Sequence, residues 1–155
     1  MTQTHTYRAH LTWTGAAQGP TKSYASYSRE HEVTVPDKAT LTMSADPRFK
    51  GDASLLNPED LLLVSLASCH MLTYLSWTGR KGLEVLAYED NPEGEMTVDR
   101  GAGQFTRVTL RPRVVVAKGS DIALAATLHE DAHRDCFISR SVNFPVHAEP
   151  EIVEE

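Results

Sequence analysis

One stretch of this chain, NPEDLLLVSLASCHMLTYLSW at residues 57–77, carries the strongest helix signal in the sequence. Asn57 is a favourable N-cap residue, and Pro58 suits the first helical position because the N–H that it lacks would have no partner there. Glu59 and Asp60 put negative charge into the first turn, where the helix dipole stabilises it. The apolar residues that follow occupy almost the whole circumference, so we expect a central helix that is covered on several sides.

The apolar part of this helix, residues 61–77, is shorter than the roughly 20 residues that cross a bilayer. Polar side chains such as Ser65 and Thr73 also interrupt it. We therefore expect a buried helix in a soluble protein and no membrane partner. Residues 1–8 contain no apolar segment of the kind found in secretion signals, which predicts a reducing, cytoplasmic location.

The composition bounds the size of the fold and the kind of partner. A length of 155 residues is that of one ordinary domain, and a hydrophobic content of 41% is enough to form a core, so we expect a single domain over residues 1–155. The chain has 21 acidic against 15 basic side chains and a formal net charge of -6. Nucleic-acid binding depends on a basic surface, so this composition argues against a nucleic-acid partner.

The segments around the helix predict an α+β fold. Short strands are expected before it, at residues 7–14, 23–28, 32–35 and 40–43. After it, residues 83–99 and 106–117 are predicted to form a long hairpin, joined by the glycine-rich turn at 100–104.

A second helix is expected near the C-terminus, at residues 120–136. Its core face is predicted to consist of Ile122, Ala125, Ala126, Leu128 and Ala132. A last strand at 142–148 precedes an acidic tail, residues 149–155, which we expect to be solvated.

Cys69 and Cys136 are the only two cysteines. A permanent disulfide is disfavoured in a reducing compartment, which directs attention to thiol chemistry. A reactive thiol needs a nearby cation or a helix N-terminus to favour its thiolate. Cys69 is about three turns beyond Asn57, too far for the helix dipole to act, so an arginine from elsewhere would be required. The alternative is an inert core cysteine, since free cysteine is among the most buried residue types.

Histidines near the cysteines offer a second kind of site. His129, His133 and Cys136 are spaced i, i+4 and i+7 on one helical face, which is compatible with three zinc ligands. No further close pair of Cys or His completes the set, so we expect neither a metal nor another cofactor. His70 follows Cys69 directly, but neighbours on a helix point about 100° apart. We therefore expect a satisfied or partly exposed histidine there and not a base.

Several features of this sequence occur together in one known family. Asn57-Pro58-Glu59 is followed ten residues after the glutamate by Cys69, and Cys136 ends a second helix. Upstream lies the segment Arg48-Phe49-Lys50-Gly51. In these motifs, and in the order of its elements over nearly the whole chain, the sequence resembles the OsmC/Ohr family of organic hydroperoxide reductases. The resemblance implies an OsmC-like fold, with antiparallel sheets wrapped around a central buried helix, and an intertwined homodimer.

The resemblance further implies an enzyme, a thiol peroxidase that reduces alkyl or fatty-acid hydroperoxides to alcohols. Cys69 would be the nucleophile that becomes a sulfenic acid, and Cys136 would resolve it as a disulfide. Glu59 and Arg48 would hold and activate the thiolate, with Arg29 as the competing arginine. The reductant would be a dithiol, either a lipoylated protein or a small dithiol.

Helical geometry adds a condition to this site. Glu59 precedes Cys69 by ten residues, about 15 Å along the helix axis, too far for the two side chains of one chain to share an arginine. If two copies pack antiparallel across a two-fold axis near Val64, Glu59 of one chain lies level with Cys69 of the other. We therefore expect a homodimer with shared active sites.

Two departures from the family pattern leave the substrate preference open. Residues 136–139 read Cys-Phe-Ile-Ser where many members have Cys-Pro-x-Ser, and His70 stands where an apolar residue is common. The alternative function is a non-catalytic redox sensor or a small-ligand-binding dimer of the same fold.

Overall fold

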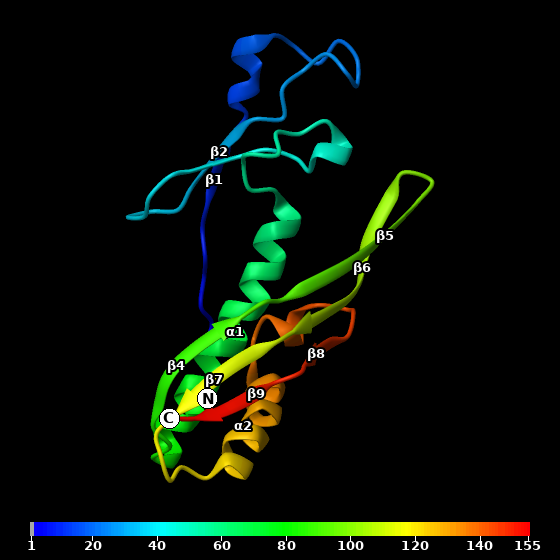
Figure 1. Ribbon diagram of the computed structural model, residues 1–155. Helices are drawn as coiled ribbons and strands as arrows, with labels where there is room; N and C mark the ends of the chain where they lie inside the picture. Colours follow the sequence, from blue (N-terminus) through cyan, green and yellow to red (C-terminus); the bar gives the residue numbers. More distant parts are fainter. Residues whose placement is uncertain (1) are drawn as a thin grey trace. The chain divides into compact units, whose positions relative to one another are not determined.

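The computed structural model describes residues 2–155 (Figure 1). The chain forms two compact units, one ending at Leu61 and the other running from Leu62 to Glu155. We describe each unit by itself.

The first unit contains a three-stranded antiparallel sheet in the order β1-β2-β3. Its strands and short 3-10 helices are β1 (His10–Thr12), η1 (Thr14–Gln18), β2 (His31–Thr34), β3 (Leu41–Met43) and η2 (Pro47–Phe49). The strands expected around residues 7–14, 32–35 and 40–43 are thus confirmed, although each is short.

The strand expected at residues 23–28 is wrong, because this segment consists of bends and turns. Several of its carbonyl groups accept hydrogen bonds from side chains and not from a neighbouring strand. The Arg29 guanidinium donates to the carbonyls of Tyr24 and Tyr27, and the indole N–H of Trp13 donates to the Ser28 carbonyl at 2.7 Å. Side-chain bonds of this kind compete with a strand ladder for the same backbone acceptors.

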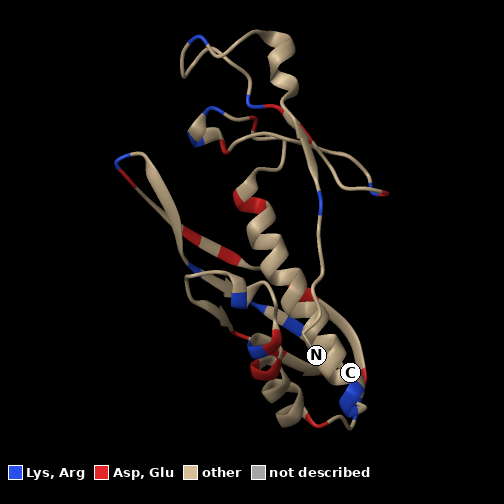
Figure 2. Cartoon of the chain, turned by 180° about the vertical axis from the view of Figure 1, so that it is seen from behind, with Lys and Arg blue, Asp and Glu red and all other residues tan. Residues whose placement is uncertain are grey.

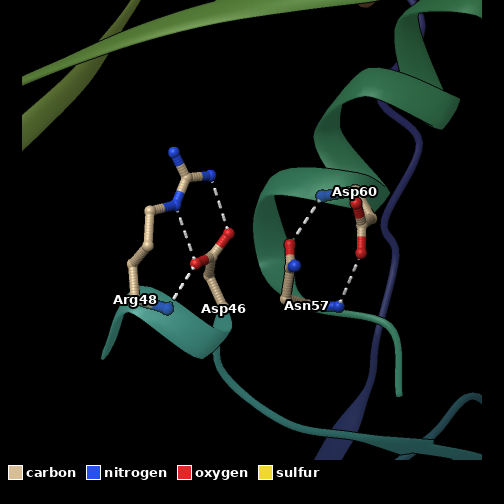
Figure 3. Close-up of polar contacts among 4 residues, drawn as sticks. All are labelled: Asp46, Arg48, Asn57 and Asp60. Atoms are coloured by element: carbon tan, nitrogen blue, oxygen red, sulfur yellow. Dashed lines mark hydrogen bonds and ion pairs between the residues drawn. The ribbon is translucent and has the colours of Figure 1, made fainter. Parts of the chain in front are cut away.

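Helix α1 (Pro58–Lys81) has 24 residues and begins as the sequence predicted. The Asp60 N–H donates to Asn57 Oδ1 at 2.9 Å, and the Asn57 N–H donates to Asp60 Oδ2 at 3.1 Å (Figure 3). This reciprocal pair satisfies two backbone donors at the start of the helix. The helix ends before Gly82, whose φ of +67° favours glycine.

The burial of α1 differs from the expectation. Its buried residues form one stripe at four-residue spacing, Leu66, His70, Tyr74 and Thr78. Val64 and Leu72 are 55% and 61% exposed. The expected cover on several sides is therefore wrong for a single chain.

The same helix also corrects the expectation about its length. With 24 residues, α1 has the length and apolar composition of a membrane-spanning helix, which the shorter run at residues 61–77 did not predict. The core helix of a soluble protein has the same properties, so length and composition by themselves are weak evidence for a membrane span.

The second unit contains two three-stranded sheets, in the orders β4-β7-β9 and β5-β6-β8. Their strands are β4 (Val85–Asp90), β5 (Glu93–Asp99), β6 (Ala102–Leu110), β7 (Pro112–Val116), β8 (Val146–Ala148) and β9 (Glu151–Glu154). Strands β5 and β6 are antiparallel and joined by Arg100-Gly101, both with positive φ, as a two-residue hairpin turn requires. The expected long hairpin is confirmed, and its arms continue into the pair β4 and β7.

The C-terminal segment corrects another expectation. Residues 151–154 are not a solvated tail but form β9, which pairs in parallel with β7. Ile152 packs against the core, and Arg113 lies between Glu89 and Glu151 at 3.6 and 3.7 Å. The basic residue of β7 thus lies between acidic residues of the neighbouring strands β4 and β9; Figure 2 colours the acidic and basic residues of the chain. In β9, Glu151 and Glu154 flank the apolar residues Ile152 and Val153, which is why an acidic segment can still form an edge strand.

Helix α2 (Ile122–Asp135) is capped by Asp121, whose Oδ1 accepts from the Leu124 N–H at 2.9 Å. Its buried residues are Ala125, Leu128, His129 and Ala132. Ile122 and Ala126 are exposed, so the expected core face is wrong at these two positions. His129 takes part in the core instead, because it is bonded to a buried histidine of α1.

Candidate thiol site

The two cysteines meet where α1 and the end of α2 come together. Cys69 is half-buried in the middle of α1, and Cys136 is fully buried as the C-cap residue of α2. Both thiols are free, and they lie close enough for Cys69 to act on the pKa of Cys136. The Cys136 sulfur also accepts the backbone N–H of Ser139 at 3.5 Å.

The surroundings of Cys136 act on its pKa in opposite directions. Burial is the largest effect and raises the pKa of the Cys136 thiol, because a thiolate is poorly solvated there. The hydrogen bond from Ser139 lowers this pKa, whereas the proximity of Cys69 raises it. The net result is a raised pKa, so Cys136 holds its proton at neutral pH.

Cys69 opens onto a cavity of about 700 Å³. The cavity is lined by Ser65, Ser68, Cys69, Leu72, Thr73, Ser76, Trp77, Arg80, Asp135, Phe137 and Ile138. Cys136 is not among the lining residues. Cys69 therefore has access to a ligand in the cavity, whereas Cys136 is buried.

A polar group lies on the wall of this cavity, around Trp77. The indole N–H of Trp77 donates to Asp135 Oδ2 at 3.1 Å. Arg134 donates to both carboxylate oxygens of Asp135, at 3.0 and 3.2 Å, and this pairing lowers the pKa of Asp135. The Arg80 guanidinium lies 5.5 Å from the centre of the indole ring. The sequence reasoning did not identify Trp77 or Arg80, although both lie on α1 within three turns of Cys69.

The predicted carboxylate and arginine lie at the other end of α1 and before it. Glu59 is in the first turn of α1. Arg48 is in η2, where its backbone N–H and its guanidinium all bond to Asp46, at 2.7 to 3.0 Å (Figure 3). This pairing lowers the pKa of Asp46 to about 2. The Arg48 side chain is 79% exposed.

Arg29, the competing arginine, is engaged by two tyrosines. Its guanidinium carbon lies 3.8 Å from the Tyr27 ring centre and 4.9 Å from that of Tyr24. Both arginines belong to the unit that ends at Leu61, whereas the thiols belong to the unit that begins at Leu62. The roles of Glu59, Arg48 and Arg29 at the thiol therefore stay predictions.

His70 and His129 form a buried pair in place of the zinc site considered above. His70 Nε2 lies 3.0 Å from His129 Nδ1, and the His129 ring stacks on Tyr74 at 3.9 Å between centres. Burial lowers the pKa of His70 to about 4 and that of His129 to about 3. Within residues 2–155, no group of three or more His, Cys, Asp or Glu is arranged to hold a metal ion.

Comparison with known sequences places the chain in a family. The model of the family described as OsmC-like protein matches residues 51–151. The uncharacterized protein YmaD of Bacillus subtilis is 30% identical over 119 residues, which cover 74% of this chain and 79% of YmaD. The chain belongs to the OsmC-like protein family.

Solved structures agree with this placement. An OsmC-like protein of unknown function from Vibrio cholerae is 28% identical with a TM-score of 0.85, over 95% of this chain and 99% of that one. An organic hydroperoxide resistance protein from Elizabethkingia anophelis is 15% identical with a TM-score of 0.71, over 100% of both chains. OhrB of Bacillus subtilis, also an organic hydroperoxide resistance protein, is 19% identical with a TM-score of 0.63, over 96% and 98%. The predicted OsmC-like α+β fold is thereby confirmed.

Proposed function

We propose that this protein is a thiol peroxidase that reduces organic hydroperoxides to alcohols, with Cys69 as nucleophile and Cys136 as resolving thiol. The observation that supports this most is the pairing of the only two thiols, of which Cys69 alone opens onto the cavity. Proteins of the same fold from Elizabethkingia anophelis and Bacillus subtilis are named for resistance to organic hydroperoxides.

In the proposed reaction the Cys69 thiolate attacks one oxygen of the hydroperoxide and the O–O bond breaks. The alkoxide leaves and takes up a proton to become the alcohol, while Cys69 becomes a sulfenic acid. The Cys136 thiol then attacks the Cys69 sulfur, an S–S bond forms and water leaves. An external dithiol, either a lipoylated protein or a small dithiol, supplies two electrons and two protons, which restores both thiols and leaves the reductant as a disulfide.

A reducing, cytoplasmic compartment would suit this cycle, because such compartments keep free thiols reduced between turnovers. The dithiol reductant would be available there. No metal or other cofactor takes part in the proposed steps.

The proposed active form is a homodimer in which residues 1–155 act as one domain. Val64 is 55% exposed and lies midway between Glu59 and Cys69 along α1, so a second copy of the helix can pack there across a two-fold axis. In that arrangement Glu59 of the partner subunit lies level with Cys69 and completes the site together with Arg48.

Mass spectrometry tests the proposed chemistry directly. After one equivalent of cumene hydroperoxide, we expect the intact chain to lose two hydrogens through a disulfide between Cys69 and Cys136, and dihydrolipoamide to restore it. If the disulfide forms but no dithiol supports repeated turnover, the protein is a redox sensor. If no disulfide forms, the peroxidase proposal is wrong.

A further inference from the structure

A second cavity, of about 520 Å³, lies between α2 and β8. Its lining includes three histidines and a carboxylate: His129, Glu130 and His133 of α2, and His147 of β8. Among residues 2–155, none of its lining residues is a cysteine or belongs to α1, the helix proposed above to meet a second copy of the chain. The cavity is therefore a separate site from the one at Cys69.

The α2 side of this cavity carries a recognisable spacing. Residues 129–133 read His-Glu-Asp-Ala-His and lie within α2. The spacing i, i+4 puts His129 and His133 on one face of the helix, one turn apart. On a helix, His-Glu-x-x-His presents two imidazole ligands to Zn²⁺ with a carboxylate beside them. So short a pattern also arises by chance, so its weight depends on the surroundings of the two histidines.

The buried histidine of this pattern has one nitrogen without a partner. His129 is 3% exposed, its Nδ1 lies 3.0 Å from His70 Nε2, and its Nε2 is buried without a hydrogen bond. His129 lines the cavity whereas His70 does not, so the Nε2 side of the ring is the side that faces the cavity. A buried polar atom without a partner costs free energy, and a ligand in the cavity would remove that cost.

The bond to His70 suits His129 to metal binding. A neutral imidazole carries one proton, so a free lone pair on His129 Nε2 places the proton on Nδ1, from which it is donated to His70 Nε2. Histidines that bind metals almost always donate their second N–H to an acceptor, which fixes the orientation of the ring. The His129 ring is also stacked on Tyr74, at 3.9 Å between centres. One ligand of the site is thus held in place before any metal binds.

Strand β8 supplies a third imidazole to the cavity. His147 is the middle residue of β8 and is exposed, as is His133. As the side chains stand, no three His, Cys, Asp or Glu groups among residues 2–155 converge on one point. Exposed side chains change rotamer within nanoseconds, so His133 and His147 can turn toward His129 Nε2 while the backbone stays in place. Cys136, considered above as a ligand beside His129 and His133, does not line this cavity.

From these observations we propose that His129, His133 and His147 bind a divalent transition-metal ion, with Zn²⁺ as the representative, in the cavity between α2 and β8. Imidazole nitrogens suit this class of ion. Three protein ligands leave the fourth position of a tetrahedral zinc ion to water, and Glu130 supplies a carboxylate to the same cavity. The proposal goes beyond the peroxidase function and does not depend on it, because it uses neither thiol.

Zinc titration tests the site on the full chain. The background is Cys69→Ser/Cys136→Ser, so that thiolates cannot bind the metal. After treatment with EDTA, we expect this protein to take one equivalent of Zn²⁺ from a chromophoric chelator. His133→Gln and His147→Gln in the same background change exposed side chains and should each weaken binding by more than the roughly tenfold that loss of an outer-sphere partner costs. His10→Gln, which changes an exposed histidine of β1, should bind as the background does.

Two further readouts identify the ligands and verify the fold. Co²⁺ added below one equivalent to the parent protein should show the visible bands of a tetrahedral ion without a thiolate charge-transfer band, because neither cysteine is a ligand. Zn²⁺ should raise the unfolding temperature of the background protein, since a ligand that binds only the folded state stabilises it. It should not raise that of His147→Gln, whose unfolding temperature without metal should equal that of the background.

The outcomes decide between a metal site and a cavity that holds only water. Failure of the background protein to bind stoichiometric Zn²⁺, or unchanged affinity in His133→Gln or His147→Gln, overturns the proposal. A thiolate band in the Co²⁺ spectrum of the parent overturns it as well. None of these results bears on hydroperoxide consumption, which depends on the thiols. A parent that consumes no hydroperoxide but loses Zn²⁺ binding on replacement of either exposed histidine keeps the metal site and refutes the peroxidase proposal alone.

Discussion

His70 Nε2 lies 3.0 Å from His129 Nδ1, so two histidines that are 59 residues apart form one hydrogen-bonded pair between α1 and α2. Both side chains are buried, at 0% and 3% exposure. Neither imidazolium would be well solvated at this position, which is why the pKa of each falls below its ordinary value. The pair links the stability of the helix packing to pH.

The free energy of unfolding should fall as the pH is lowered from about 6.5 to 4. Across this window the unfolded chain binds protons at His70 and His129 that the folded chain does not bind, so stability rises with pH. The shift of His70 alone, from 6.5 to about 4, corresponds to about 3 kcal/mol. Urea unfolding at a series of pH values measures this slope. His133→Gln changes an exposed histidine of α2, the helix that carries His129, and should keep most of this pH dependence. A free energy of unfolding that does not change with pH in the parent protein would contradict the prediction.

Replacing the two cysteines should separate their roles. Cys69→Ser should abolish hydroperoxide consumption, because the nucleophile is lost. Cys136→Ser should leave a single turnover and trap a sulfenic acid on Cys69, which dimedone labelling followed by mass spectrometry detects. Two variants that turn over like the parent would show that neither thiol is catalytic.

The choice between the two arginines can be made from the pH profile of the reaction. A cation near a thiol favours the thiolate. In Arg48→Ala, the rise of activity that accompanies thiol ionisation should therefore occur at higher pH, and the attack on the hydroperoxide should be slower. Arg29→Ala is the matched comparison. If only Arg29→Ala changes the profile, Arg29 is the activating residue and Arg48 is a surface partner of Asp46.

The start of α1 should depend on its side-chain caps. Asn57→Ala removes the acceptor for the Asp60 N–H, and we expect a loss of about 1 kcal/mol in the free energy of unfolding. Denaturant titration measures the loss. Asn57→Asp retains an acceptor at this position and should lose less, whereas equal stability of Asn57→Ala and the parent would argue against the cap.

The exposed face of α1 should be a dimer interface. Val64→Glu would place a charge at the proposed two-fold axis, so we expect a dimer to dissociate into monomers in analytical ultracentrifugation. Leu86→Glu alters another exposed apolar residue, 52% exposed on β4, and should leave the oligomeric state unchanged. A parent protein that sediments as a monomer would contradict the shared-site proposal.

Much of the secondary structure could be read from local signals. Asn57, Pro58 and Asp60 specify the start of α1 through caps that act within one turn, and Arg100-Gly101 specifies the β5–β6 hairpin through backbone preferences of two adjacent residues. The strand expected at residues 23–28 failed because Arg29 and Trp13 occupy its carbonyls, which alternation alone does not reveal.

The sequence was sufficient for the elements with local causes, for the family resemblance and for the choice of Cys69 and Cys136 as candidate residues. Tertiary structure was needed for everything that joins distant segments: the proximity of the two thiols, the pair of His70 and His129, the pairing of β9 with β7, and the cavity beside Cys69. The physical reason is that caps and turns depend on neighbours within a few residues, whereas burial and thiol chemistry depend on which remote side chains exclude water from the same place.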